Sequence, residues 1–338
     1  MLRLAMILYS LIGTTLAGSA VIAALTMGYG TLQPILIAGP TASGKSALAL
    51  RLAEALGGTI INADSMQVYR ELRILTARPS QADLARVAHR LYGHVCARES
   101  YSAGRFVEEV RDGLADVHAL GRRPIIVGGT GLYFKALTEG LSPIPAVDEE
   151  VRAHWRREAD RRGALSLHAE LREADAEMAA RLSPADTQRI VRALEVLTSS
   201  GVSLAEWQRR RGIPVIDEAS ALAFVVEGDR AALTARADAR LERMIEEGAL
   251  EEVRALAALG LDPSLPAMRA LGVAPLMECV RGEISIPAAL SRAKIETRRY
   301  IKRQETWFNR YMITWRKINT QEMESNWRDI IAFIQSTH

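Results

Sequence analysis

The sequence predicts an α/β fold in which a parallel sheet is flanked by helices. Three short apolar runs, at 34–38, 59–63 and 124–128, each lead into glycine or small polar residues. Stretches with the apolar spacing of helices, at 47–56 and 102–120, lie between these runs. Strands that alternate with helices favour parallel pairing with right-handed crossovers. Ligands of such sheets bind at the carboxyl ends of the strands, so residues that follow the three runs should share one crevice.

A change in composition predicts an all-helical insertion domain. Residues 148–208 are rich in Ala, Leu, Arg and Glu and contain no strand pattern. Within them, Ser183 followed by Pro184 predicts a helix start, with Ser183 as the cap. A returning strand is expected at 223–226, and the chain after it reads as mostly helical.

The expected domain organisation follows from these patterns. The sheet core is split into two segments, and the later segment includes helical runs at 230–259 and 286–311. The expected parts are an N-terminal extension at 1–34, a core at 35–147 and 209–318, an insertion at 148–208, and a C-terminal tail at 319–338.

Composition sets limits on location and partners. Among 338 residues, 49% are hydrophobic and 25% are charged, which is ordinary for a soluble enzyme. The formal net charge of +3 provides no global basic field, so a nucleic-acid site would have to come from local clusters. Cys96 and Cys279 are too few for a disulfide framework or a zinc site and suit a reducing cytosol. We therefore expect a cytoplasmic protein, and because nothing demands a dimer, a monomer.

The first 34 residues are atypical. No charge occurs between Leu4 and Met27, a length and composition that can span a bilayer. The glycine-rich loop described next suits phosphate, and secretion would separate an enzyme with such a loop from its substrates, so cleavage as a signal peptide is discounted. Two interpretations stay open, a membrane anchor and a non-native extension. A membrane partner is expected only if the segment is a genuine anchor.

A glycine-rich loop follows the first predicted strand. Its glycines let several backbone N–H groups point at a phosphate, and the helix that follows adds its positive end. Lys45 supplies a point charge, and the Ser46 hydroxyl can bind Mg²⁺. The core is therefore expected to resemble P-loop NTPases. The loop residues are Gly39, Pro40, Thr41, Ala42, Ser43, Gly44, Lys45 and Ser46.

The loop alone does not identify the reaction, because kinases, ATPases and some transferases share it. A motor ATPase usually has an acidic residue after an apolar strand to help hold magnesium. The strand at 125–127 instead leads into Gly128, Gly129, Thr130 and Gly131. This departure directs attention to the other strand ends.

Several blocks, in order between about residues 35 and 312, resemble one family. They are 39–46, Asp64–Tyr69, Tyr101–Ala103 with Phe106, Val127–Tyr133, Ser183–Pro184 with Asp186, Gln188–Val196, and Lys302–Gln304 with Thr306–Phe308. Together they resemble the tRNA dimethylallyltransferases, also called isopentenyl-pyrophosphate transferases.

The resemblance implies a reaction and its partners. Enzymes of this family move a dimethylallyl group from dimethylallyl pyrophosphate to the exocyclic N6 of the adenosine 3′-adjacent to the anticodon. Pyrophosphate leaves, and a phosphate loop with Mg²⁺ is suited to stabilise it. The implied partners are a tRNA anticodon stem-loop and the isoprenoid donor. A nucleotide kinase and a prenyltransferase of free adenine nucleotides remain as alternatives.

The resemblance also assigns roles near the loop. Asp64 is the implied general base for the adenine amine, with a structural or magnesium-associated carboxylate as the alternative. Thr130 is implied near the transferred group, and Arg236 near the pyrophosphate, although Arg230 and Arg240 are close in sequence. Family members contact the target base with the residues that match Ser65, Met66 and Gln67.

Other residues are implied to meet the tRNA. Arg152 is a weaker match at the start of the insertion, and the main segment is Gln188, Arg189, Ile190, Val191 and Arg192. Independently, residues 292–317 carry nine basic and two acidic side chains with five interleaved aromatics, which suits both RNA contact and core packing.

The chain departs from the family pattern in two places near these blocks. A position that is usually glycine reads Leu75, and the usual Asp-Pro before Tyr101 is absent, with Arg98 and Glu99 nearby. The change at Leu75 is expected to alter the loop beside the target base.

Overall fold

The structure, a computed structural model, describes residues 32–322, 325 and 327–336. Nearly all of the unusual N-terminal segment expected at 1–34 lies outside the described residues. Within the described ranges, no helix combines the length and the apolar character needed to cross a membrane.

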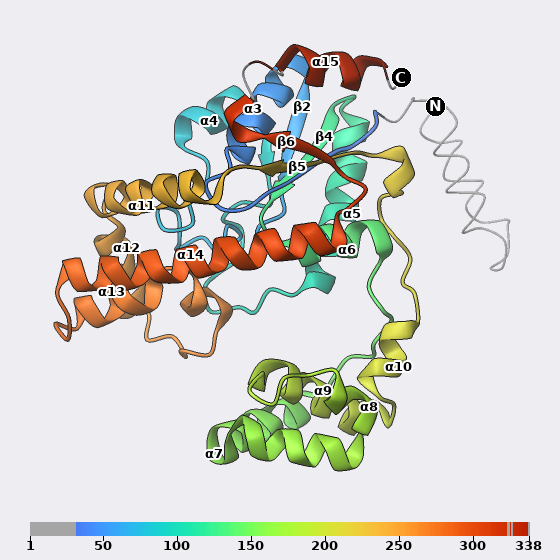
Figure 1. Cartoon of the computed structure of the whole chain (residues 1–338), viewed down its shortest axis with the longest axis vertical. Helices are drawn as coiled ribbons and strands as arrows, with labels where there is room; N and C mark the ends of the chain where they lie inside the picture. Colours follow the sequence, from blue (N-terminus) through green and yellow to red (C-terminus); the bar gives the residue numbers. More distant parts are fainter. Residues whose placement is uncertain (1–31, 323–324, 326, 337–338) are drawn as a thin grey trace, which may run out of the picture. The chain divides into compact units, whose positions relative to one another are not determined.

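The core is a six-stranded sheet in which every neighbouring pair of strands is parallel, in the order β3-β2-β4-β1-β5-β6 (Figure 1). Helices flank this sheet, which confirms the predicted fold class. The strands are β1 (Ile35–Ala38), β2 (Gly58–Asn62), β3 (His89–Arg90), β4 (Arg123–Gly128), β5 (Leu222–Glu227) and β6 (Arg316–Asn319).

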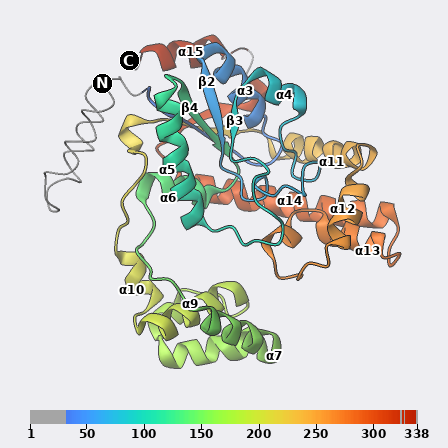
Figure 2. The same cartoon turned by 180° about the vertical axis from the view of Figure 1, so that it is seen from behind.

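Burial explains why the central strands read as continuous apolar runs. Every residue of β1, β2 and β4 is buried, as expected when helices cover both faces of a parallel sheet. Leu48 and Leu52 of the helix after β1 join one core cluster with Ile35, Ile60 and Phe224. Figure 2 shows α5 (Ala103–Ala119), the helix between β3 and β4 in the chain, beside the sheet.

The helices of this unit mostly follow the sequence pattern. The helix at 286–311 has the predicted ends, and Gly57 ends the first helix in a left-handed conformation, with φ of 63°. The helices are α3 (Lys45–Leu56), α4 (Gln81–Arg86), α5 (Ala103–Ala119), α6 (Gly131–Glu139), α11 (Arg230–Glu246), α12 (Ala249–Ala258), α13 (Val273–Val280), α14 (Ile286–Tyr311) and α15 (Trp327–Ser336), with short 3-10 turns η1 (Glu218–Ser220), η2 (Pro266–Arg269) and η3 (Thr320–Glu322).

Three features of this unit differ from the sequence prediction. The run at 230–259 is two helices, because Gly248 adopts φ of 100° and separates α11 from α12. The sequence did not predict β3 or β6, since β3 has two residues and β6 is an edge strand of mainly charged and polar residues. Residues expected as a tail include α15, whose Ile330 and Ile334 are buried in the sheet core.

A second compact unit spans Lys135–Val215, and the first comprises the other residues that the structure describes. Its helices are α7 (Glu149–Ala174), α8 (Ala176–Ala180), α9 (Thr187–Ser200) and α10 (Leu204–Arg209). Trp155, Leu171, Ile190 and Leu194 contribute to its own hydrophobic core. The insertion was expected at 148–208, whereas the compact unit also includes the connecting segments on either side.

The predicted helix start at Ser183 and Pro184 is wrong. Helix α9 begins at Thr187, and its cap is Asp186, whose carboxylate accepts the Arg189 N–H at 3.2 Å. Asp is as good a cap as Ser, so the pattern alone did not decide between the two positions.

Candidate active site

The glycine-rich loop joins the end of β1 to α3, as the sequence predicts. Its backbone closes through the Ser43 N–H, which donates to the Pro40 carbonyl at 3.2 Å. Ala42 and Gly44 have positive φ angles of 64° and 85°. Only glycine adopts the second conformation without strain, and the turn presents the start of α3 as an anion site.

A cavity of about 660 Å³ opens against this loop and is called here the loop cavity. Loop residues 42–47 line it on one side, and α11 lines it on the other. The cationic side chains in its lining outnumber the acidic Glu242 and Glu246, so the cavity suits an anion. These cations are Lys45, Arg236, Arg240 and Arg243.

Lys45 has an unusual protonation equilibrium. Its ammonium donates to the Pro40 carbonyl at 3.2 Å. Burial lowers the pKa of Lys45 from 10.5 to about 8, the Asp64 carboxylate partly opposes that shift, and Arg240 adds to it. A bound pyrophosphate would stabilise the charged form and raise this pKa again.

Asp64 follows β2, and its carboxylate lies close enough to Lys45 to affect the pKa of that ammonium. Its Oδ1 accepts the Met66 N–H at 2.9 Å, and its own N–H donates to Asn62 Oδ1 at 2.9 Å. A Cβ placed on Gly129 would lie 3.3 Å from Asp64 Oδ2 and 3.6 Å from the Gly39 carbonyl oxygen. The ends of β1, β2 and β4 therefore converge, as the parallel sheet predicts.

A second cavity of about 230 Å³, called here the Asp64 cavity, lies at this convergence. Thr41, Asp64, Ser65 and Met66 line it, and the hydroxyphenyl ring of Tyr300 contributes from α14. The rest of the lining includes an apolar wall and three guanidinium groups. These residues are Leu75, Leu241, Met244, Leu271, Arg240, Arg269 and Arg303.

Thr130, expected near the transferred group, and Gln67, expected at the target base, hold neighbouring loops. The Thr130 hydroxyl accepts the Ser65 N–H at 3.0 Å and donates to Ser65 Oγ at 3.3 Å. The Gln67 amide donates to the Thr76 carbonyl at 2.8 Å. Because neither side chain lines the Asp64 cavity, both act on its shape through Ser65 and through the segment that carries Leu75.

Three of the four arginines of α11 have separate surroundings. Arg230 pairs with Glu305 at 2.7 Å, and Arg236 donates from Nε to the Ala42 carbonyl at 3.0 Å. Arg240 lines both cavities, and its Nε is buried without a hydrogen-bond partner. Burial lowers the pKa of Arg240 while Asp64 opposes the shift. The resemblance implied Arg236 near the pyrophosphate and left Arg230 and Arg240 as residues that could be confused with it. The spacing of four between Arg236 and Arg240 puts both on one helix face.

Gln304 of α14 has no role assigned from the sequence. Its Oε1 accepts the Thr41 N–H and its Nε2 donates to the Gly129 carbonyl, both at 2.9 Å. The side chain is only 5% exposed. The one sequence signal was its place in the block Lys302–Gln304, and the pairing itself depends on tertiary structure.

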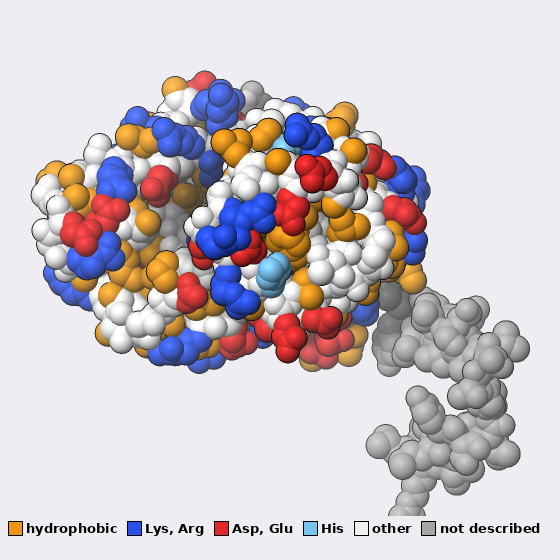
Figure 3. Space-filling model, turned by 90° about the horizontal axis from the view of Figure 1, so that it is seen from below, with side chains coloured by type: hydrophobic (Ala, Val, Ile, Leu, Met, Phe, Trp, Pro, Cys, Tyr) orange, Lys and Arg blue, Asp and Glu red, His pale blue; other side chains and the backbone are white. Residues whose placement is uncertain are grey.

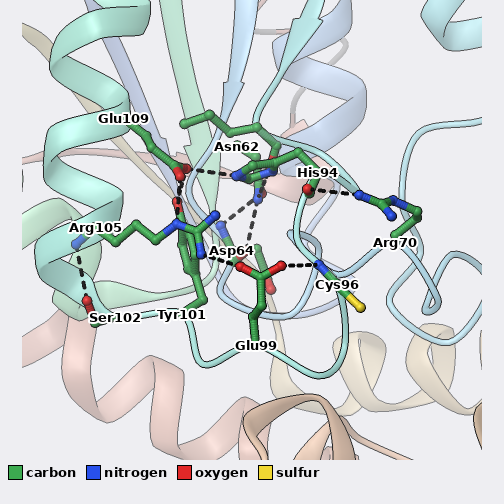
Figure 4. A network of polar contacts seen from close by, with 11 residues as sticks. Asn62, Asp64, Arg70, His94, Cys96, Glu99, Tyr101, Ser102, Arg105 and Glu109 are labelled. Carbon is green, nitrogen blue, oxygen red and sulfur yellow. Dashed lines mark hydrogen bonds and ion pairs between the residues drawn. The ribbon is translucent and has the colours of Figure 1, made fainter. Parts of the chain in front are cut away.

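A polar network centred on Glu109 fixes the segment beside Asp64 (Figure 4). The Glu109 carboxylate contacts Tyr101, Arg105 and His94 at 2.7 to 2.8 Å. The hydrogen bonds to these three partners hold the pKa of Glu109 below its usual value, although burial opposes them. Asn62, at the end of β2, donates from Nδ2 to the Asp64 carbonyl at 2.9 Å and to the Leu91 carbonyl at 3.0 Å.

In the helical unit, the residues implied to meet tRNA divide by exposure. Ile190 and Val191 are 0% and 9% exposed and belong to the hydrophobic core, so their side chains do not face solvent. Gln188 is exposed, and the Arg189 side chain is 68% exposed, with Asp186 at 3.5 Å. Arg192 contacts Glu195 at 3.4 Å, and Arg152 contacts Glu149 at 3.5 Å.

The basic character of residues 292–317 is partly neutralised within the fold. Arg292, Lys294 and Arg298 pair with Glu278, Glu242 and Asp238, respectively. On the face that Figure 3 presents, basic side chains are interspersed with acidic ones. Arg303, by contrast, lines the Asp64 cavity, so the basic residues of α14 serve more than one role.

The site also meets the needs of a magnesium ion bound mainly by substrate. Ser46 is exposed, begins the first turn of α3 with Lys45, and lines the loop cavity. Among the residues that the structure describes, no group of three or more His, Cys, Asp or Glu side chains is arranged to hold a metal. A single serine hydroxyl beside the anion site is the position at which phosphate loops hold Mg²⁺, which otherwise keeps water and phosphate oxygens as ligands.

Comparison with known proteins agrees with this geometry. A family model described as IPP transferase matches residues 67–311. The chain is 53% identical over 300 residues to a tRNA dimethylallyltransferase of Mesorhizobium japonicum, which covers 88% of this chain and 93% of the relative. A tRNA dimethylallyltransferase of Parvibaculum lavamentivorans is 52% identical over 302 residues, covering 89% and 96%.

Solved structures are similar over most of the chain. The full-length tRNA isopentenylpyrophosphate transferase of Bacillus halodurans is 28% identical, with a TM-score of 0.63 over 90% of this chain and 97% of that one. A eukaryotic dimethylallyltransferase acting on tRNA is 25% identical, with a TM-score of 0.72 over 87% of this chain and 75% of that one. The family model covers more than half of the chain and the relatives named above are more than half identical to it, so the chain belongs to the IPP transferase family.

Proposed function

We propose that this enzyme transfers the dimethylallyl group of dimethylallyl pyrophosphate to N6 of the adenosine 3′-adjacent to the anticodon in tRNA, releasing pyrophosphate. The observation that carries the proposal is the position of Arg240, which lines both the loop cavity and the Asp64 cavity. A donor that spans this junction would have its pyrophosphate on the loop and its reacting carbon near Asp64.

The loop cavity supplies the leaving-group site. Backbone N–H groups, Lys45 and the guanidinium groups of Arg236 and Arg240 stabilise the negative charge that develops on the pyrophosphate as the carbon–oxygen bond breaks. We assign Ser46 as the protein ligand of Mg²⁺, which would neutralise further charge on the phosphate oxygens. Lys45 and Arg240 would interact most directly with the negative charge on the leaving pyrophosphate.

The Asp64 cavity supplies the acceptor site. The adenine N6 attacks the allylic carbon while the bond to the pyrophosphate oxygen breaks, and the amine loses one proton. We assign Asp64 Oδ2 as the acceptor of that proton, since Oδ1 already accepts the Met66 N–H. The apolar wall of Leu75, Leu241 and Leu271 suits both a branched hydrocarbon and the face of a base.

The helical unit is the proposed second contact with tRNA. Gln188, Arg189 and Arg192 share the first turns of α9, and the exposed guanidinium of Arg189 suits a backbone phosphate. Arg152 is a further proposed contact. An acceptor as small as free adenosine monophosphate would not require this surface, which favours RNA over free nucleotides.

The test uses labelled dimethylallyl pyrophosphate. The full-length protein is incubated with Mg²⁺ and an anticodon stem-loop, with AMP in place of the RNA, or with ATP alone. Label in the stem-loop only is the expected result. Label in AMP would indicate a prenyltransferase of free nucleotides, and ATP turnover without prenyl transfer would contradict the proposal.

A further inference from the structure

Three consecutive residues of the phosphate loop each form a hydrogen bond with a residue from a different element later in the chain. The Thr41 N–H donates to Gln304 of α14, and the Ala42 carbonyl accepts from Arg236 of α11. The third bond is from the Thr320 hydroxyl to the Ser43 carbonyl, at 2.6 Å. Thr320 begins η3 and lies beyond residue 311, where the match to the family model ends.

The fold brings Thr320 to this position through the edge of the sheet. Strand β6 pairs in parallel with β5, and Asn319 lies in register with Glu227 at the carboxyl end of both strands. Since β5 also pairs with β1, the residue after β6 reaches the loop that follows β1. The Asn319 carboxamide accepts the Gln321 N–H at 3.0 Å, which fixes the turn that carries Thr320.

The segment after β6 is itself anchored to the helix that the loop precedes. The Arg51 guanidinium of α3 lies 4.2 Å from the centre of the Trp327 ring of α15. Ile330 and Ile334 of α15 are buried in the same cluster as Leu48 and Leu52 of α3. Thr320 therefore contacts the loop, and α15 contacts the helix, that together form the anion site.

The Thr320 bond determines the direction of one backbone donor. A trans peptide unit is planar, so the Ser43 carbonyl and the Gly44 N–H point in opposite directions. With the carbonyl held by Thr320, the Gly44 N–H points away from β6. Gly44 lines the loop cavity, and a hydrogen bond to the carbonyl also strengthens the N–H on the same peptide as a donor.

We propose that Thr320 is a positioning residue for the pyrophosphate group of the donor, acting through the Ser43–Gly44 peptide. The inference rests on the proposed function and deepens it by adding the C-terminal strand to the binding machinery. It requires that loss of the hydroxyl weaken pyrophosphate binding while leaving the chemical step and the RNA acceptor unaffected.

The experiment measures Mg²⁺–pyrophosphate binding by calorimetry and steady-state kinetics in the full-length protein. Thr320→Val is expected to raise the pyrophosphate Kd and the KM for the donor about three- to tenfold, the range for one lost hydrogen bond. The kcat and the KM for the stem-loop stay within about twofold. Thr320→Ser, which keeps the hydroxyl, restores both constants.

Thr314→Val is the matched control. Thr314 also donates a hydroxyl hydrogen bond, at 2.7 Å, but to Glu218 and away from the loop. Equal weakening in Thr314→Val, or unchanged binding in Thr320→Val, would overturn the proposal. If Thr320→Val does not fold, Thr320→Ala, confirmed as folded by its thermal melt, gives the same comparison. A wild-type protein that does not bind pyrophosphate would instead contradict the proposed function.

Discussion

Gln304 and Thr41 are joined by a hydrogen bond of 2.9 Å between the side-chain carbonyl and the backbone N–H. The other end of the same carboxamide donates to the Gly129 carbonyl at 2.9 Å. One buried amide thus connects the phosphate loop to the turn after β4, whose neighbour is Asp64. An amide is needed here, because one end must accept a hydrogen bond and the other must donate one.

We expect Gln304→Leu to lower the free energy of unfolding by about 1–3 kcal/mol for each backbone group left unpaired. The Kd for pyrophosphate should rise as well, because the phosphate loop loses its link to the turn after β4. Urea unfolding and calorimetry provide the measurements. Thr306→Val, at an exposed position of the same helix, is the control and should change neither value. Full stability in Gln304→Leu would contradict the role of the amide.

Asp64→Asn keeps the shape of the side chain and removes its basicity. We expect kcat to fall about 10²- to 10⁴-fold, the usual contribution of a general base. Pyrophosphate affinity should change little, because the loop is untouched. Single-turnover transfer of labelled donor to the stem-loop measures the step. Turnover equal to that of the wild type would exclude Asp64 as the base and leave it a structural role.

Lys45 predicts a pH dependence with a defined direction. Its pKa is lowered to about 8, so the ammonium loses its proton above that pH and pyrophosphate binding weakens. The log of Kd should rise by up to about one unit per pH unit there, relative to Lys45→Met. The comparison with this variant removes the titration of pyrophosphate itself. Parallel profiles for the two proteins would argue against a role for the Lys45 charge.

The same shift affects stability in the unliganded protein. Between pH 8 and 10.5, the unfolded chain binds the Lys45 proton and the folded chain does not. This group therefore makes the free energy of unfolding rise with pH across that window, and Lys45→Met removes the rise. Chemical unfolding of the wild type and of Lys45→Met at several pH values measures this difference in the free energy of unfolding.

Arg240→Met tests the junction of the two cavities. We expect the KM for the donor to rise about 10- to 100-fold, as for loss of a charged contact with a phosphate. Arg230→Met is the control on the same helix, since Arg230 pairs with Glu305. Equal effects of the two substitutions would mean that Arg240 contributes only to the general charge of α11.

Arg189→Ala tests the helical unit. The KM for the stem-loop should rise. The slope of the log of the RNA association constant against the log of the salt concentration should decrease in magnitude by about one, as for one lost phosphate contact. Arg161→Ala is the control, because Arg161 is exposed on the same unit and pairs with Glu158 at 2.6 Å. An unchanged salt slope in Arg189→Ala would remove this residue from the RNA surface.

Local patterns were sufficient for much of the fold. The apolar runs at β1, β2 and β4 and the ends of α14 depend on residues close in sequence, so they could be predicted. Strand β6 could not, since an edge strand of charged residues has no apolar signature and is stabilised by its pairing with β5. The start of α9 was misplaced because Ser183 and Asp186 are equivalent capping residues.

The anion-binding loop, the parallel sheet and the family can all be recognised in the amino-acid sequence, because glycine spacing, apolar periodicity and ordered motifs are properties of the chain. Which side chains serve the site depends on the folded protein. Arg240 rather than Arg230 lines both cavities, Gln67 and Thr130 hold loops, and Thr320 reaches Ser43 from 277 residues away. The physical reason is that hydrogen bonds and burial depend on distances in space, which the order of strands fixes and the spacing of residues does not.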